Sequence, residues 1–478
     1  MATRPRRRPT WVRRFLQSAT RERPTLLIPV VVSFSVLMTS GCASAPPPDT
    51  QSEAAAGEAA GLADAVVFRV DGGPDDEPDA PSELTLPEAV RLAVTTDPGV
   101  QASLARVRVA LADAKQTRLL PNPILSLAFR VPEGGGKPLI EAALAQDIIA
   151  ILTIPGRSRA SDNRLRQASA EVITTTIDLV AEVQERYATA QALEQLLLVL
   201  DQRASILSKV VELAKARLAA GEGIRGDVTT LETQRIELDV EIAERTQELR
   251  DERLRLARLI GRPSAGADWR LEPWTPPTLT DVPESVWIDA GLRCRPEIQE
   301  CVWLLAALGD ELGLARMLAF DGASGGVQAQ RDGGWQAGPE LSVPVPIFDS
   351  GGVRAERVSA EQIEARHELV RAKRHVIEDV RRALESLART RDNARRVRME
   401  LIPLQEKRRA QAEASFSAGQ SDATALLLAE QDLHAAQAKA VELDQRAALA
   451  AIRLQRAVGG PGPASRVNAS GPSEGGVK

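Results

Sequence analysis

The sequence predicts a mainly α-helical fold in which long antiparallel coiled-coil hairpins are joined to short strands of a membrane β-barrel. Three observations support this prediction. The chain from residue 83 onward contains an internal duplication. Long stretches place apolar residues at alternating steps of three and four, which is the spacing of coiled coils. Shorter stretches alternate apolar and polar residues with a period of two, as strands with one wet face do.

The duplication predicts the domain organisation. Three anchor pairs share an offset of 198 residues, namely Pro98 with Pro296, Gly221 with Gly419, and Gly261 with Gly459. A fourth pair, Gly156 and Gly352, is 196 residues apart, so about two residues of slippage lie within the repeat. We therefore expect a first structural repeat at 83–261, a linker at 262–283 and a second repeat at 284–459.

Composition excludes several classes of protein. Hydrophobic residues make up 44% of the chain and aromatic residues only 3%, which fits long helices packed through small side chains better than an enzyme core. Residues 1–41 contain eight arginines and one acid, so they carry +7; with a total of −5, the remainder carries −12. A net acidic mature chain gives no electrostatic reason to bind nucleic acid.

Residues 1–41 are expected to be a lipoprotein signal peptide. Their arginine-rich start is followed by the apolar run 26–38, which is too short to span a bilayer stably. Cys42 follows small residues, as the lipidated cysteine of a bacterial lipobox does, and acyl chains such as palmitate would hold it to a leaflet. The alternatives are an ordinary cleaved signal with an incidental cysteine, or a twin-arginine signal at 13–14.

Two segments are expected to lack structure. Residues 42–82 are rich in Ala, Pro, Asp, Glu and Gly and offer little apolar surface to bury, so they predict a flexible acylated tether. Residues 460–478 resemble them in composition and predict a disordered tail. The folded body is therefore expected to lie between these two segments.

The sequence predicts no enzyme, no cofactor and no metal site. Walker, nucleophile-elbow, zinc-protease and paired-cysteine motifs are all absent from it. Cys294 and Cys301 are seven residues apart, about 10 Å along one helix, which is beyond disulfide reach. His367 and His375 lack carboxylates at metal-ligand spacing. Small buried thiols and surface histidines are the expected interpretation.

Each repeat is expected to start with a helix and continue into a strand pair. Thr85 and Glu88 form a helix start, and the prolines on either side of Asn122 end the helical periodicity. The alternating apolar positions are Leu125, Leu127, Phe129 and Val131, then Ile140, Ala142, Leu144 and Ile148, and later Val327, Trp335, Ala337, Leu341, Val343, Val345 and Ile347. Such strands suit a membrane barrel with a wet lumen, and a soluble sheet over a core is the alternative.

Long coiled-coil helices follow each strand pair. The apolar seams consist of Leu193, Leu197, Leu200, Ala204, Leu207, Val211, Ala214 and Leu218, and of Val376, Val380, Ala383, Leu387, Thr390, Ala394, Val397, Leu401 and Leu404. The first helix is expected to run from about 159 to 220, roughly 90 Å. Pro403 should kink the second, while Gly221 and Gly419 let the chain fold back.

The ordered motifs resemble those of the outer membrane efflux channel family typified by TolC. The resemblance covers residues 84–460, and its carriers are Leu84-Thr85-Leu86-Pro87-Glu88-Ala89, Leu120-Pro121-Asn122-Pro123, Leu341-Ser342-Val343-Pro344-Val345-Pro346-Ile347-Phe348-Asp349-Ser350-Gly351-Gly352 and Ala418-Gly419. The stretch Ile154-Pro155-Gly156-Arg157 is similar to the basic glycine motif of the heavy-metal and cation exporting branch. In this order and in two copies, the motifs are specific for this family.

The resemblance implies a trimeric exit duct in the outer membrane. Each protomer would give four strands to a 12-stranded transmembrane barrel and two hairpins to a periplasmic α-barrel. Metal cations or drugs would pass through it passively from an inner-membrane RND or ABC transporter and a periplasmic adaptor, the membrane fusion protein. The alternatives are the same fold serving type I protein secretion, and a structural periplasmic coiled-coil lipoprotein.

The resemblance also implies a gate at the hairpin tips, where acidic residues after the glycine line the narrowest ring. Asp227 matches the acidic position in the first repeat, and Asp422 is the nearest acid in the second, which has Ala425 and Leu428 where acids are common. Convergent carboxylates would attract cations. A solvated helix cap is the alternative for Asp422. Glu222 and Arg225 are further gate candidates.

Overall fold

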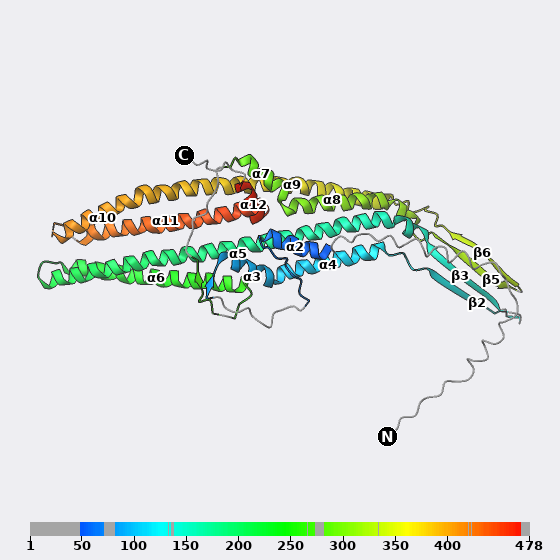
Figure 1. Ribbon diagram of the computed structural model, residues 1–478, viewed down its shortest axis with the longest axis horizontal. Helices are drawn as coiled ribbons and strands as arrows, with labels where there is room; N and C mark the ends of the chain where they lie inside the picture. The colour runs from blue at the N-terminus through cyan, green and yellow to red at the C-terminus, as the bar shows by residue number, and fades with distance from the viewer. Residues whose placement is uncertain are drawn as a thin grey trace, which may run out of the picture. The chain divides into compact units, whose positions relative to one another are not determined.

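The structure is a computed structural model, and it describes residues 48–70, 82–131, 133–134, 138–264, 266–272, 282–332, 334–418, 420–421 and 423–469. These residues all belong to one structural unit, Pro48–Lys478 (Figure 1). The predicted signal peptide, Cys42 and Asp422 lie outside the described residues. No helix among the described residues combines the length and the hydrophobicity needed to cross a bilayer.

Both halves of the chain contain a helix pair, a strand pair, a long helix and a returning helix in that order. The first half consists of α2 (Pro48–Ala59), β1 (Glu83–Leu84), α3 (Leu86–Thr96), α4 (Pro98–Arg118), β2 (Ile124–Arg130), β3 (Leu139–Asp147), α5 (Ile148–Ala219), α6 (Arg225–Leu259) and β4 (Arg270–Leu271). The second half consists of α7 (Glu284–Cys294), α8 (Pro296–Ala315), the 3-10 helix η1 (Met317–Phe320), β5 (Ser324–Asp332), β6 (Gly334–Ser342), α9 (Gly352–Arg396), the π-helix η2 (Val397–Leu401), α10 (Ile402–Ser417), α11 (Ala423–Ala457) and α12 (Pro461–Ala469).

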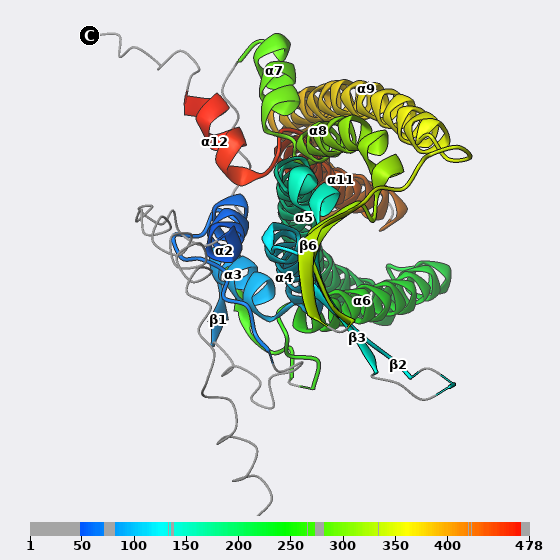
Figure 2. The same ribbon diagram turned by 90° about the vertical axis from the view of Figure 1, so that its right-hand side faces the viewer.

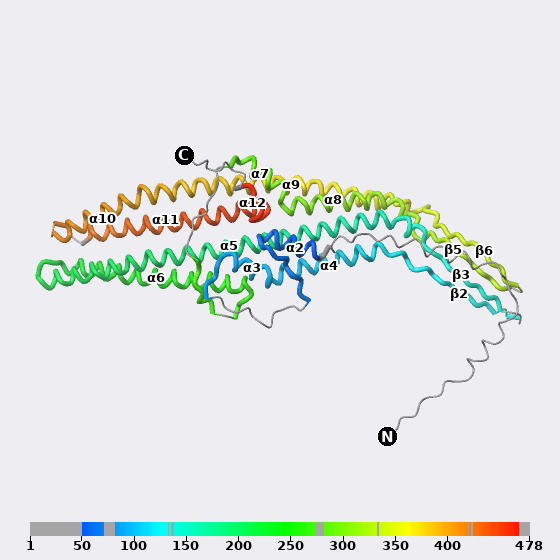
Figure 3. Tube along the Cα trace, in the orientation of Figure 1, coloured from blue at the N-terminus to red at the C-terminus, as the bar shows by residue number. Residues whose placement is uncertain are grey.

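Helix α5 begins eleven residues earlier than the sequence predicts. It has 72 residues, which corresponds to about 108 Å, and runs without a break through Pro155 (Figure 3). Asp147 caps it by accepting a hydrogen bond from the amide of Ala150 at 2.7 Å. A Cβ on Gly156 would lie 2.6 Å from Cδ2 of Leu314, so this glycine lets α8 approach α5 closely.

The strands form one antiparallel sheet in the order β2-β3-β5-β6. The β3–β5 pairing, with Leu144 opposite Val327, joins the two halves of the chain. The predicted strand positions are correct within β2, β3, β5 and β6, but Ile148 belongs to α5. Val343 and the apolar residues after it follow β6, which ends at Ser342, opposite Ser324, the first residue of β5.

The predicted tether and tail are partly wrong. Residues of α2 pack against α4 and α5, and Ala56 and Val66 are fully buried. Helix α12 buries Ala464 and Val467. Short alanine-containing helices bury small residues one at a time, which bulk composition does not reveal. The predictions therefore hold for neither 48–59 nor 461–469.

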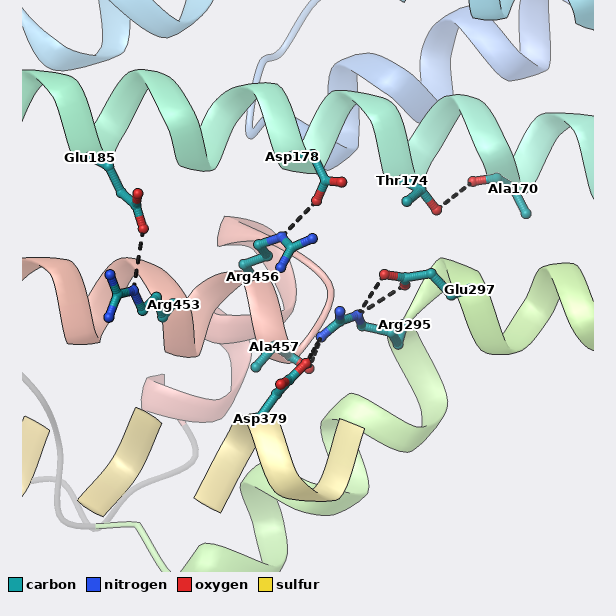
Figure 4. A network of polar contacts seen from close by, with 10 residues as sticks. All are labelled: Ala170, Thr174, Asp178, Glu185, Arg295, Glu297, Asp379, Arg453, Arg456 and Ala457. Carbon is teal, nitrogen blue, oxygen red and sulfur yellow. Dashed lines mark hydrogen bonds and ion pairs between the residues drawn. The ribbon is translucent and has the colours of Figure 1, made fainter. Parts of the chain in front are cut away.

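Helices α5 and α11 pack side by side and connect the two hairpins. Small residues line the contact, and Ala181, Ala188 and Ala448 are buried there. Ion pairs flank them, with Asp178 Oδ1 2.6 Å from Arg456 Nε and Glu185 Oε1 3.5 Å from Arg453 Nε (Figure 4). Small side chains allow the two helices to approach closely, and the ion pairs lie at the margin of the contact.

Arg295 ties the start of the second half to its end. Its guanidinium is nearly buried and contacts Glu297 at 2.9 Å, Asp379 at 3.4 Å and the carbonyl of Ala457 at 3.4 Å (Figure 4). The hydrogen bonds come from Nε and Nη1, so one side chain connects α8, α9 and α11. It stands at the C-terminal end of α7, where Pro296 opens the next helix.

The inner face of the second long helix changes phase at η2. The amide of Ile402 donates to the carbonyl of Val397, five residues back, so the inner face steps from 397 to 402. Leu401 and Leu404, which the sequence places in the seam, are therefore exposed. In a continuous α-helix the ring of Pro403 would clash with a carbonyl one turn earlier, and the π-bulge relieves that clash.

Deleting Met399 should close the π-bulge and place Pro403 inside a continuous α-helix. We expect the free energy of unfolding to fall by about 3 kcal/mol, because proline in a helix interior removes a hydrogen bond and clashes. Denaturant titration measures this, and Pro403→Ala in the same background should recover most of the loss. A deletion that is neutral with Pro403 in place would contradict this explanation.

Tyr187 clamps the small parallel pair β1–β4. It is the only tyrosine, is buried, and donates to the carbonyl of Leu84 at 2.8 Å while accepting from the amide of Glu272 at 3.0 Å. Burial raises its pKa to about 12, and the hydrogen bond from Glu272 opposes this shift.

Titration of Tyr187 can be read directly, because tyrosinate absorbance reports this residue alone. Its folded pKa lies above the ordinary value of about 10. The neutral phenol therefore stabilises the fold fully below pH ~10, and this contribution is lost as the pH rises through about 12. We expect a midpoint near 12 in the folded chain and near 10 in urea, and a Tyr187→Phe control without signal. A folded-state midpoint near 10 would contradict the buried clamp.

Candidate functional site at the hairpin tips

The two hairpins end in equivalent turns. At the first tip Gly221 has a φ of 79°, and the amide of Glu222 donates to the carbonyl of Arg217 at 2.9 Å. At the second tip the amide of Gln420 donates to the carbonyl of Ser415 at 2.9 Å. The two donors, and likewise the two acceptors, are 198 residues apart, which is the offset of the duplication. The two tips therefore fold back in the same way.

The structure brings three of the four predicted gate residues together at the first tip. Glu222 and Arg225 are exposed, and Asp227 is half-buried in the first turn of α6. The amide of Asp227 donates to the carbonyl of Ile224 at 3.1 Å. A carboxylate at this position also favours the positive end of the helix dipole. Asp227 can therefore be a stabilising helix-start residue as well as a cation-attracting one.

Phe416 links the two tips, and sequence reasoning missed it. Its ring is buried in a cluster with Leu207, Val211 and Leu427. The guanidinium of Arg217 lies 4.9 Å from the ring centroid and donates from Nη1 to the Phe416 carbonyl at 3.4 Å. The sequence did offer one indication, because Phe416 lies three residues before the hairpin glycine and the chain has only seven phenylalanines.

A buried polar cluster lies behind the second tip, and it too was missed. Glu430 and His434 are nearly buried on α11; His434 Nε2 lies 3.3 Å from Glu430 Oε2. Arg409 Nε on α10 lies 3.8 Å from Glu430 Oε1, and His434 Nδ1 is 3.0 Å from Oε1 of Gln437. The i, i+4 spacing of Glu430 and His434 was the sequence signal. These groups connect α10 to α11 and include no nucleophile.

The remaining sequence candidates do not converge on a reactive centre. His367 and His375 are exposed as predicted, but Cys294 is also exposed, and the break at Arg295 places it on α7 while Cys301 lies on α8. Burial raises the pKa of the Cys301 thiol, which makes it a poor nucleophile. Within the part of the chain that the structure describes, no three His, Cys, Asp or Glu side chains could hold a metal.

The family model of outer membrane efflux proteins matches residues 292–460, which hold most of the second half. The family resemblance that the sequence predicts is thereby confirmed. This family consists of efflux channels and is not an enzyme family.

Similar proteins match over both repeats. Nodulation protein T of Rhizobium leguminosarum bv. trifolii is 24% identical over 397 residues, which cover 77% of this chain and 84% of that protein. The outer membrane protein VceC of Vibrio cholerae matches with a TM-score of 0.67 and 18% identity over 79% of this chain and 96% of VceC. CusC matches with a TM-score of 0.67 and 16% identity over 84% of this chain and all of CusC, at 100%. The shared fold therefore covers both halves.

The contact between Arg217 and Phe416 should be energetically coupled. Phe416→Ala is expected to cost about 3–5 kcal/mol because it leaves a cavity between the hairpins. The double variant with Arg217→Ala should lose about 0.5–1 kcal/mol less than the sum of the single changes, because the stacking is lost only once. Denaturant titration measures all three, and Arg250→Ala, on the exposed face of α6, is the control for arginine removal. Strict additivity would contradict the coupling.

Proposed function

We propose that this protein is the trimeric outer-membrane exit duct of a tripartite efflux system. The observation that carries the proposal is the four-stranded sheet, whose outer strands β2 and β6 each pair on one side only among the described residues. Four strands are too few to close a barrel, since about eight are needed. Three chains with four strands each would form the 12-stranded barrel and remove the open edges.

The faces of the sheet support a membrane location for that barrel. Leu125, Leu127 and Phe129 share one face of β2, and all three are exposed in the single chain. On the opposite face Arg130 Nη1 lies 3.1 Å from Glu141 Oε1 across the β2–β3 pair. An apolar face toward lipid and a charged face toward a lumen is the pattern of membrane barrels.

The long hairpins support a periplasmic extension of the duct. Helix α5 alone spans about 108 Å from the sheet to the tip. We infer that the tips meet a periplasmic adaptor that receives substrate from an inner-membrane pump, and that Cys42 carries the lipid anchor. The gate would lie at the tips, with Asp227 and Asp422 as its acidic residues and Glu222 and Arg225 beside them.

The motif that resembles the cation-exporting branch has a structural explanation. Gly156 makes room for Leu314, and Arg157 donates from Nη2 to the carbonyl of Ala150 at 3.0 Å. Both residues thus hold the start of α5 in place beside α8. The motif therefore does not distinguish metal ions from drugs, and the acidic tip is the feature that favours cations as the transported class.

Conductance measurements with Asp227→Ala test the gate. We expect the purified protein in planar bilayers to form channels whose blockade by multivalent cations weakens at least about tenfold in the variant, because a ring of carboxylates attracts cations. Asp201→Ala, an exposed acid on α5 away from the tip, is the matched control and should behave like the native protein.

Two outcomes would count against the proposal. Absence of channels and of trimers in detergent would overturn the exit-duct function itself. Channels with unchanged cation blockade in Asp227→Ala would overturn only the gate assignment. Deleting the gene and measuring susceptibility to metals and hydrophobic drugs would then identify the transported class.

A further inference from the structure

Helix α6 carries a second coiled-coil seam that the single chain leaves exposed. Its inner face buries Leu231 and Leu238 against α5. On the other side, uncharged residues recur at steps of four and three and are all exposed: Thr229, Thr233, Ile236, Val240, Ala243 and Gln247. Ile236 is 65% exposed and Val240 is 53% exposed. This spacing predicts packing against another helix.

An exposed apolar patch lies on the opposite flank, where the π-bulge shifts the helix phase. Leu404 is 62% exposed, and Leu401, one turn before it on the same face, is also exposed. The inner face there is made by Ile402 and Phe416 instead. The bulge therefore removes two leucines from the hairpin seam and presents them outward.

The two surfaces lie at the two ends of one row of helices. Helix α6 packs on α5, α5 packs on α11, and α11 packs on α9 and α10. Viewed along the long axis, α6 and α9 stand at the two ends of a curved arrangement (Figure 2). The sheet has the same order, with β2 and β6 at its ends. One chain cannot bring these ends together, but a second copy can.

The two surfaces also lie at the same height along the helix axes. A 630 Å³ groove is lined by Ala192 of α5 together with Glu241 and Arg245 of α6. A 220 Å³ cavity is lined by the same Ala192 together with Arg398 and Ile402 beside the π-bulge. Residues near 240 on α6 and near 400 on the opposite flank therefore lie level with Ala192.

Charge distinguishes the two flanks and makes them complementary. Residues 225–251 contain eight acids and four bases, a net charge of −4, whereas 389–413 contain eight bases and four acids, a net charge of +4. Glu237 and Glu244 on α6, and Arg395 and Arg396 on α9, are exposed and make no ion pair within the described residues. Complementary patches of this kind select the partner surface.

We propose that the α6 seam of one copy, centred on Ile236 and Val240, packs against the patch of Leu401 and Leu404 of the next copy. The inference rests on the proposed trimer and specifies its helical interface. Because the two surfaces differ, the contact is head-to-tail and closes into a ring when repeated. The π-bulge supplies the apolar half of this interface.

Paired cysteines test the contact in the full-length protein. In a Cys294→Ser/Cys301→Ser background, Val240→Cys combined with Leu404→Cys should give covalent dimers and trimers with a short bismaleimide, and either change alone should give none. The control pair is Val240→Cys with Ile363→Cys. Ile363 is also an exposed apolar residue, but it lies 41 positions before Leu404, roughly 60 Å along the helix.

Charge reversal tests the direction of the pairing. Glu237→Lys with Glu244→Lys should lower the trimer fraction at low salt at least about tenfold, and adding Arg395→Glu with Arg396→Glu should restore it. Trimers that conduct but neither cross-link at 240 and 404 nor respond to reversal would overturn this interface and leave the proposed function intact. Absence of trimers in the native protein would overturn both.

Discussion

The close contact between α5 and α11 is the constraint on which the rest of the structure depends. Helices of this length cannot be stabilised by one compact core, because each turn has its own neighbours. The alanines between them allow the two hairpins to approach over several turns, and ion pairs such as Asp178–Arg456 fix their relative position. Buried Phe416 secures this contact at the tips. Toward the sheet α8 packs on α5 in place of α11, and the β3–β5 ladder joins the two halves there.

The two halves use different chemistry at equivalent positions. In the first half Asp97 accepts a hydrogen bond from the amide of Val100 at 2.9 Å and acts as a helix cap. In the second half Arg295 occupies that position and reaches α9 and α11 instead. The joint between the first two helices is therefore stabilised by a local helix cap in the first half and by long-range contacts in the second.

Much of the fold could be predicted from the sequence, because periodicity and turn residues act locally. The strand pairs, the glycine turns and the seam from Leu200 to Ala214 follow from spacing alone. The start of α5, the exposure of Leu401 and the packing of α2 could not be predicted, because each depends on a partner distant in sequence or on a single-residue change of phase. At the tips, the glycine turn predicts where Glu222, Arg225 and Asp227 lie, and the family resemblance suggests them as gate candidates. The Arg217–Phe416 contact requires knowing which hairpins are neighbours.

The π-bulge has a consequence for how the two halves have diverged. The long segment from Gly352 to Gly419 is two residues longer than that from Gly156 to Gly221. An inserted residue would normally rotate every later side chain of a helix by about 100°. A bulge at Val397–Leu401 absorbs one such residue within a single turn, so the inner face from Ile402 to Phe416 keeps its phase. The second half can therefore change length during evolution while its tip still matches that of the first.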